Sequence, residues 1–151
     1  MLYSCIYTLI ATLGFGILFN IKGKNLVFAS IGGGVSWFFY LLTYSNLHFA
    51  NLIAFFIASV IGSVYSEVMA RILKAPVTTF IICAIIPLVP GGGMYYTMFS
   101  SIQGNVNESL NLGLQTLSIA GTVAIGVFLV SSITKAIVFF ARKLKTKVVK
   151  I

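Results

Sequence analysis

The sequence predicts an all-α membrane protein with five transmembrane helices, its N-terminus outside the cell and its C-terminus in the cytoplasm. Of the 151 residues, 59% are hydrophobic and 8% are charged, and the mean hydropathy is +1.06. Soluble domains carry roughly 25% charged residues. The net charge of +8 is therefore interpreted as a membrane-surface feature, and we expect no nucleic-acid partner.

Five apolar segments follow one another in a single transmembrane domain over residues 1–151. A helix that crosses the hydrocarbon core needs about 20 mostly apolar residues. The predicted spans are residues 2–19, 26–44, 51–69, 77–102 and 110–140, with polar turns at 45–50 and 105–108. The fifth span is longer than the bilayer requires, so we expect it to tilt or to extend into the cytosol.

The basic residues alternate between successive connections, and this alternation predicts the orientation. Cytoplasmic loops of membrane proteins are enriched in Lys and Arg. The second and fourth connections contain neither residue, whereas the first, the third and the tail at 141–151 are basic. The residues concerned are Lys22, Lys24, Arg71, Lys74, Arg142, Lys143, Lys145, Lys147 and Lys150. The basic tail is also expected to contact anionic lipid.

The fourth segment contains the run Pro87-Leu88-Val89-Pro90-Gly91-Gly92-Gly93, which predicts a broken helix. An unpaired backbone group in hydrocarbon costs several kcal/mol, so such a break survives only beside protein or a water-filled cavity. Broken helices form binding sites near the bilayer midplane in secondary transporters. The alternative is a structural kink with its backbone buried in protein. A single crossing is favoured over a re-entrant loop, because it keeps the basic tail on the cytoplasmic side.

The second half of this broken helix, expected to start near Met94, is a candidate substrate site. Backbone N–H groups at a helix N-terminus attract anionic groups. Tyr95, Tyr96 and Thr97 follow directly and can supply hydroxyl groups beside them.

Glu67 and Arg71 form a second candidate site near the end of the third span. Their spacing of four residues places both side chains on one face of a helix, where they can form an ion pair. One interpretation is that the two residues only neutralise each other at the inner interface. The other is that a carboxylate within the membrane takes part in proton coupling or in opening the cytoplasmic side.

No pattern in the sequence predicts an enzyme, a metal site or a cofactor. The chain has only two acidic residues, and it lacks paired carboxylates, a Ser/His/Asp arrangement and a phosphate-binding GxxxxGK[ST] motif. Cys5 and Cys83 lie in apolar segments without a CxxC motif, and His48 falls in a predicted outer loop. The cysteines are therefore interpreted as small buried hydrophobic residues.

The end of the third span and the broken fourth span resemble the threonine/serine exporter family, in its small-subunit or C-terminal-half form. The resemblance rests on Ser66-Glu67-x-x-Ala70-Arg71, Lys74-Ala75-Pro76 and Ile86-Pro87-Leu88-Val89-Pro90-Gly91-Gly92-Gly93-Met94-Tyr95. It implies functional positions at Glu67, Arg71, Pro87, Pro90, Gly91, Gly92 and Tyr95. It also implies export of threonine and serine across a bacterial inner membrane, driven by the proton motive force, together with a larger membrane subunit.

Three other functions stay open beside this one. Some split members of the family are similar to dicarboxylate exporters of the succinate type. A scaffold or assembly subunit, with the substrate path entirely in its partner, is a second alternative. A passive channel is the third, and flux that is insensitive to an uncoupler would distinguish it.

Overall fold

The computed structural model describes residues 2–46 and 50–148, and within these ranges it is helical and contains no strand. His48, predicted to lie in an outer loop, falls outside the described residues. The helices are α1 (Leu2–Leu18), α2 (Lys24–Leu41), the π-helix η1 (Leu42–Asn46), α3 (Asn51–Ile72), α4 (Val77–Ile85), the 3-10 helix η2 (Ile86–Leu88), α5 (Gly91–Ile102) and α6 (Val106–Val148).

Three of these helical segments are long and apolar enough to cross a membrane. They are Lys24–Ser45, Asn51–Ile72 and Val106–Phe140. A fourth span results if Val77–Leu88 and Gly91–Ile102, which are bent by 52° at the break, are taken as one crossing. The apolar helix Tyr3–Leu18 is shorter than these. The chain is thus an integral membrane protein with three or four clear spans, and a fifth span stays a prediction.

The last helix differs from the sequence prediction at both ends. Residues 105–108 were expected to form a turn, but α6 begins at Val106, and the connection from α5 is the short turn Gln103–Asn105. Gly104 has a φ of 79° there, a left-handed conformation that costs glycine little. Helix α6 then continues to Val148 through most of the predicted basic tail. Its 43 residues correspond to about 64 Å at ~1.5 Å per residue.

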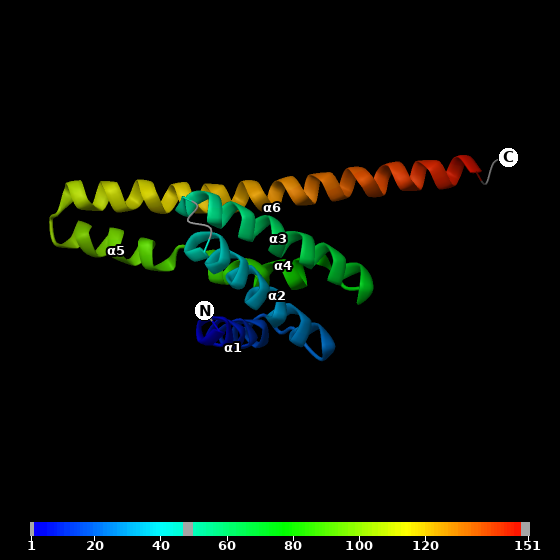
Figure 1. Ribbon diagram of the computed structural model, residues 1–151, viewed down its shortest axis with the longest axis horizontal. Helices are drawn as coiled ribbons and strands as arrows, with labels where there is room; N and C mark the ends of the chain where they lie inside the picture. The colour runs from blue at the N-terminus through cyan, green and yellow to red at the C-terminus, as the bar shows by residue number, and fades with distance from the viewer. Residues whose placement is uncertain (1, 47–49, 149–151) are drawn as a thin grey trace.

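Helices α1 to α4 form a bundle, and α5 pairs with α6 in a separate hairpin (Figure 1). Within the bundle, α2 packs against α1, α3 and α4, and α4 also packs against α3. Helix α6 joins the bundle through α3, whereas α5 packs extensively against α6 alone. The α5–α6 hairpin, which comprises α5 and residues 106–119, extends away from the bundle in Figure 1.

Small residues hold the bundle together, as is usual between membrane helices. The buried positions of α3 are Ala54, Phe55, Ala58, Ser59, Gly62, Ser63, Ser66 and Ala70. The hydroxyl groups of Ser59, Ser63 and Ser66 donate to carbonyl oxygens of α3 itself, at 2.7 or 2.8 Å. These serines therefore act in the helix contacts as small side chains without an unpaired donor.

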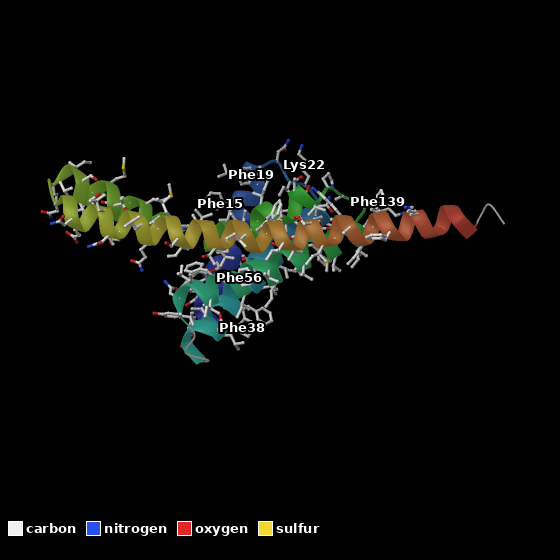
Figure 2. The ribbon with its side chains drawn as sticks, turned by 90° about the horizontal axis from the view of Figure 1, so that it is seen from above. Phe15, Phe19, Lys22, Phe38, Phe56 and Phe139 are labelled. Atoms are coloured by element: carbon white, nitrogen blue, oxygen red, sulfur yellow. The ribbon has the colours of Figure 1, made fainter. Side chains whose placement is uncertain are left out.

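Glycines allow the closest approaches between helices. A Cβ atom added at Gly33 of α2 would lie 2.9 Å from the carbonyl oxygen of Cys83 and would also meet the side chain of Thr12. In the hairpin, Gly93 lies against Thr116 and Gly113 against Thr97. The outer surface is apolar by contrast: Phe15, Phe19, Phe38 and Phe139 are all exposed (Figure 2), as expected where lipid replaces water.

Candidate functional site

The break between α4 and α5 is formed by Pro87, Pro90 and the two residues between them. Pro87 and Pro90 have no N–H group, so the α-helical hydrogen-bond pattern cannot continue through them. Val89 adopts an extended conformation and donates its N–H to the carbonyl of Ile86 at 3.2 Å. The N–H of Gly91 donates to Val89 at 2.7 Å, and α5 begins at Gly91, three residues before the predicted start.

The break lies close to one end of α3. Leu88 is fully buried in a cluster with Phe55, Ala58, Ile119 and Val123. Phe55 and Ala58 belong to the first two turns of α3, which starts at Asn51. Relative to α3, the break therefore lies toward the end where α2 and α3 are connected, not at the middle of the helix.

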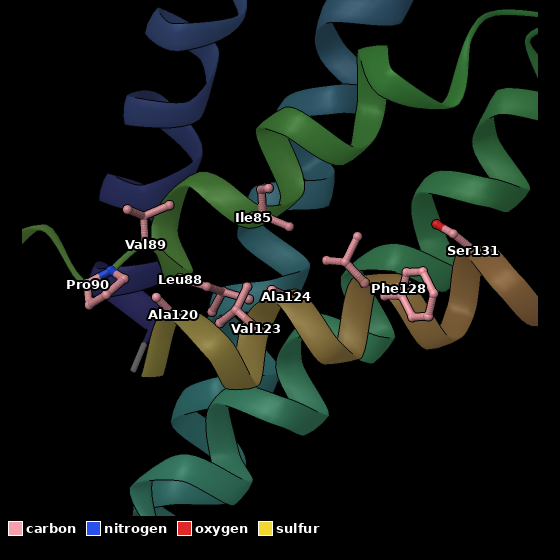
Figure 3. Close-up of a pocket in the computed structure, with 10 residues that line it drawn as sticks. Ile85, Leu88, Val89, Pro90, Ala120, Val123, Ala124, Phe128 and Ser131 are labelled. Atoms are coloured by element: carbon pink, nitrogen blue, oxygen red, sulfur yellow. The ribbon is translucent and has the colours of Figure 1, made fainter. Parts of the chain in front are cut away.

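A groove of about 460 Å³ separates one face of the break from α6 (Figure 3). We call it the α6 groove, and its lining residues are Ile85, Leu88, Val89, Pro90, Ala120, Val123, Ala124, Val127, Phe128 and Ser131. Among these side chains only Ser131 is polar. Such a lining offers a charged solute almost no hydrogen-bond partners, so the α6 groove by itself is unsuited to a zwitterion or a dianion.

The opposite face of the break borders a second groove of about 290 Å³. We call it the α1 groove, and it is lined by Tyr7, Thr8, Ala11, Thr12, Trp37, Ile86 and Pro87. Hydroxyl groups and aromatic rings thus meet at the predicted break. Neither α1 nor Trp37 was singled out from the sequence. The available signal was that this tryptophan is the only one in the chain.

The three hydroxyl residues predicted to flank the break do not line either groove. Tyr95 and Tyr96 are 63% and 58% exposed on the surface of α5. The Thr97 hydroxyl donates to the carbonyl of Gly93 at 2.7 Å, and its methyl group lies against Gly113 of α6. A role for these residues in substrate binding stays a prediction. Gly91 and Gly92 face open space, since an added Cβ would meet no atom within 4 Å.

Glu67 and Arg71 form the ion pair that their spacing suggested. The Arg71 Nη2 atom lies 3.8 Å from Glu67 Oε2, and the side chains are 53% and 13% exposed, respectively. The pair borders a pocket of about 120 Å³ between α3 and α6, whose other lining residues are Val64, Val68, Thr134 and Ile137. This ion-pair pocket combines a mostly buried carboxylate with enough room for several water molecules.

The structure does not bring the ion-pair pocket and the break together. Glu67 follows Ala58, which packs beside the break, by nine residues of α3, or about 14 Å. Helix α6 connects the two places: Ser131 lines the α6 groove, and Thr134, one turn later, lines the ion-pair pocket. Neither of these two hydroxyl residues was singled out from the sequence, although they are spaced by three residues in a mostly apolar stretch of α6.

No group of three or more His, Cys, Asp or Glu side chains that could bind a metal ion occurs within residues 2–46 and 50–148. Cys83 is buried and Cys5 is partly buried, and both are free thiols. The described residues thus offer hydroxyl groups, one partly exposed ion pair and apolar surface for function.

Comparison with known proteins adds a family assignment to this geometry. The family model described as threonine/serine exporter, ThrE, matches residues 4–133. The chain is also 31% identical over 104 residues to an uncharacterized protein of Haemophilus influenzae, and the match covers 68% of this chain and 34% of that protein. The chain therefore spans about a third of the length of this relative. No solved structure matches the chain.

Proposed function

The chain belongs to the threonine/serine exporter family, and on that premise we propose that it is a membrane subunit of a secondary transporter for small amino acids. The match to the exporter family over residues 4–133 is the observation that carries the proposal. The substrates we propose are threonine and serine. We further propose that the proton motive force drives their export across a bacterial inner membrane, with the N-terminus outside.

The geometry of the broken helix supports this proposal. A helix interrupted between two grooves can expose either face as the surrounding helices move, which is what alternating access requires. The ion-pair pocket supplies a titratable carboxylate on the same helix, α3, that packs against the break. In this mechanism the break contributes to the substrate site, and Glu67 couples its opening to protonation.

A larger membrane subunit is proposed as the partner of this chain. Two thirds of the Haemophilus influenzae relative lie outside the matched part, so its similar segment belongs to a longer polypeptide. The α5–α6 hairpin packs extensively only within itself and exposes Met94, Met98, Ile102, Leu110, Leu114 and Leu117. An apolar surface of this kind suits either lipid or the helices of a second subunit.

The direct test is efflux from cells that co-express the chain with its genomic neighbour. We expect labelled threonine and serine to leave the cells faster than in cells without the pair, and an uncoupler to abolish the difference. Efflux of succinate instead would assign the chain to a dicarboxylate exporter. Amino-acid efflux that is unaffected by the uncoupler would indicate a passive channel.

A scaffold subunit is the second candidate, and the apolar lining of the α6 groove favours it. If the substrate path lies entirely in the partner, residues at the break will never contact substrate. Photo-crosslinking groups placed at Ile86 and Val89, which line the α1 groove and the α6 groove at the break, distinguish the two functions, because only a transporting subunit places the break beside the substrate. Protection of these positions by threonine supports the transporter, and its absence supports the scaffold.

Replacing Gly91 or Gly92 by leucine should reduce export without unfolding the protein. Neither position has an atom within 4 Å of an added Cβ, so the new side chain fits the fold while occupying the space beside the break. We expect export to fall about fivefold or more, since ~1 kcal/mol of added barrier corresponds to roughly that factor. Gly121→Leu is the matched control, because Gly121 is equally open but lies in α6. Equal export in all three variants would reduce the break to a structural kink.

A further inference from the structure

The α1 groove, on the face of the break opposite α6, has a chemistry of its own. It extends from Tyr7, which is 69% exposed, to Thr12, which is fully buried. Its volume of about 290 Å³ is near the lower limit of the ~300–1,000 Å³ that small-molecule sites occupy. Such a site suits a ligand of a few heavy atoms.

The threonine hydroxyls of this groove can only accept hydrogen bonds from a ligand. Thr8 donates its single hydroxyl proton to the carbonyl of Ser4 at 2.8 Å. Thr12 donates to carbonyls of its own helix and of α2, the shortest distance being 2.9 Å to Thr8. Both protons are thus engaged, and Thr12 is fully buried, so a ligand in the groove meets the lone pairs of the partly exposed Thr8 oxygen. They therefore favour a ligand that donates hydrogen bonds.

The aromatic residues of the groove favour the same kind of ligand. Trp37 and Tyr7 both line it, and the face of an indole or phenol ring attracts an ammonium group. Lysine and arginine are absent from the lining, so a dicarboxylate would find no countercharge there. The Tyr7 hydroxyl and the Trp37 N–H are neutral donors that supply an anion with no countercharge, so the threonine acceptor and the aromatic rings together favour a small cationic donor.

We propose that the α1 groove is the subsite for the ammonium end of the exported amino acid. The ammonium group lies against Trp37 and Tyr7 and donates to the Thr8 hydroxyl. This assignment rests on the proposed function, and it places the substrate on the α1 side of the break, away from the apolar α6 groove. The carboxylate end of the substrate then lies toward the mouth of the groove, beyond the residues that line it.

The sole tryptophan of the chain gives a direct readout, because Trp37 lines the proposed subsite. Purified full-length protein in lipid nanodiscs is titrated with threonine, serine and succinate while tryptophan emission is recorded. We expect a saturable change with both amino acids and none with succinate at the same concentrations. A saturable response to succinate, or no response to either amino acid, would overturn the proposal.

Two variants test the hydroxyl contribution. Thr8→Val removes one acceptor of the groove and should weaken threonine binding about tenfold or more, as loss of one hydrogen bond to a charged group predicts. Thr122→Val is the matched control: its hydroxyl makes the same bond within a helix, to Ser118 at 2.7 Å, but it is exposed on α6. If both variants bind threonine as the unchanged protein does, the groove is not the subsite.

Export measurements separate this proposal from the proposed function. In the co-expressed pair we expect the half-saturating threonine concentration to increase from unchanged protein to Trp37→Phe and further to Trp37→Leu, in the order of their ability to hold a cation. Normal export by Trp37→Leu overturns the subsite and leaves the exporter function intact. Absence of amino-acid export by the unchanged pair refutes the exporter function itself.

Discussion

Replacing Glu67 by glutamine is expected to lower the rate of amino-acid export about tenfold or more. This decrease corresponds to an increase of ~1.4 kcal/mol in the free-energy barrier to transport. The substitution keeps the size of the side chain but removes the carboxylate, so protonation of this position can no longer be coupled to transport. It also leaves Arg71, 3.8 Å away, without its anionic partner. Export of labelled threonine from cells with matched amounts of membrane-inserted protein measures the effect.

The chain provides the control for this experiment, because it contains only one other acidic residue. Glu108 lies in the first turn of α6, at the tip of the hairpin, far from the ion pair. Glu108→Gln changes the net charge equally and should export at nearly the unchanged rate. If Glu67→Gln exports as well as Glu108→Gln, Glu67 and Arg71 only neutralise each other.

Replacing Gly33 by valine should produce the largest loss of stability. The new Cβ would lie 2.9 Å from the backbone oxygen of Cys83 and against the side chain of Thr12, so α1, α2 and α4 would have to move apart. Overpacking of this kind costs about 1–3 kcal/mol. We expect a lower midpoint in thermal unfolding of detergent-solubilised protein, followed by circular dichroism.

Gly14→Val is the matched variant for this measurement. Gly14 also lies within a helix, α1, but an added Cβ there meets no atom within 4 Å. Because the gain in helix propensity from glycine to valine is the same at both positions, the difference between the two midpoints measures the cost of the overpacking at Gly33. Similar midpoints for the two variants would mean that α2 and α4 separate without cost.

The break and the main helices were predictable from the sequence because their signals are local. Two prolines remove two N–H groups wherever they occur, and the helix does break between Pro87 and Pro90. The predicted spans at 26–44, 51–69 and 77–102 fall within or beside α2, α3 and the α4–α5 pair. The ion pair of Glu67 and Arg71 was predictable for the same reason, because the i,i+4 spacing places both side chains on one face of the same helix.

The predicted turn at 105–108 was wrong because polar residues there were interpreted as a turn, whereas α6 begins at Val106. Glu108 is favourable in the first turn of a helix, where the backbone dipole is positive, so polarity at 105–108 marked a helix start. Lysine and arginine are good helix formers, and the basic segment continues the helix to Val148. Hydropathy predicts where a chain is apolar, and it does not predict where a helix ends.

The arrangement of the site could not be predicted because it depends on how helices pack. The groove chemistry comes from α1 and Trp37 on one side and from α6 on the other, and no sequence spacing relates these elements. The separation between the break and Glu67 likewise follows from the height at which Leu88 packs on α3. Small residues form these helix contacts, and such residues would allow the helices to pack in several different registers.

The serines of α3 have a consequence for motion. At the contact with α6, the Ser59 hydroxyl donates to Phe56 of its own helix, and Gly126 lies against Ser59. Among the described side chains, no hydrogen bond joins α3 to α6. Packed helices can shear past one another when only dispersion contacts must be exchanged. Because α6 joins the bundle through α3, α6 can shift along α3 without breaking a hydrogen bond between these two helices.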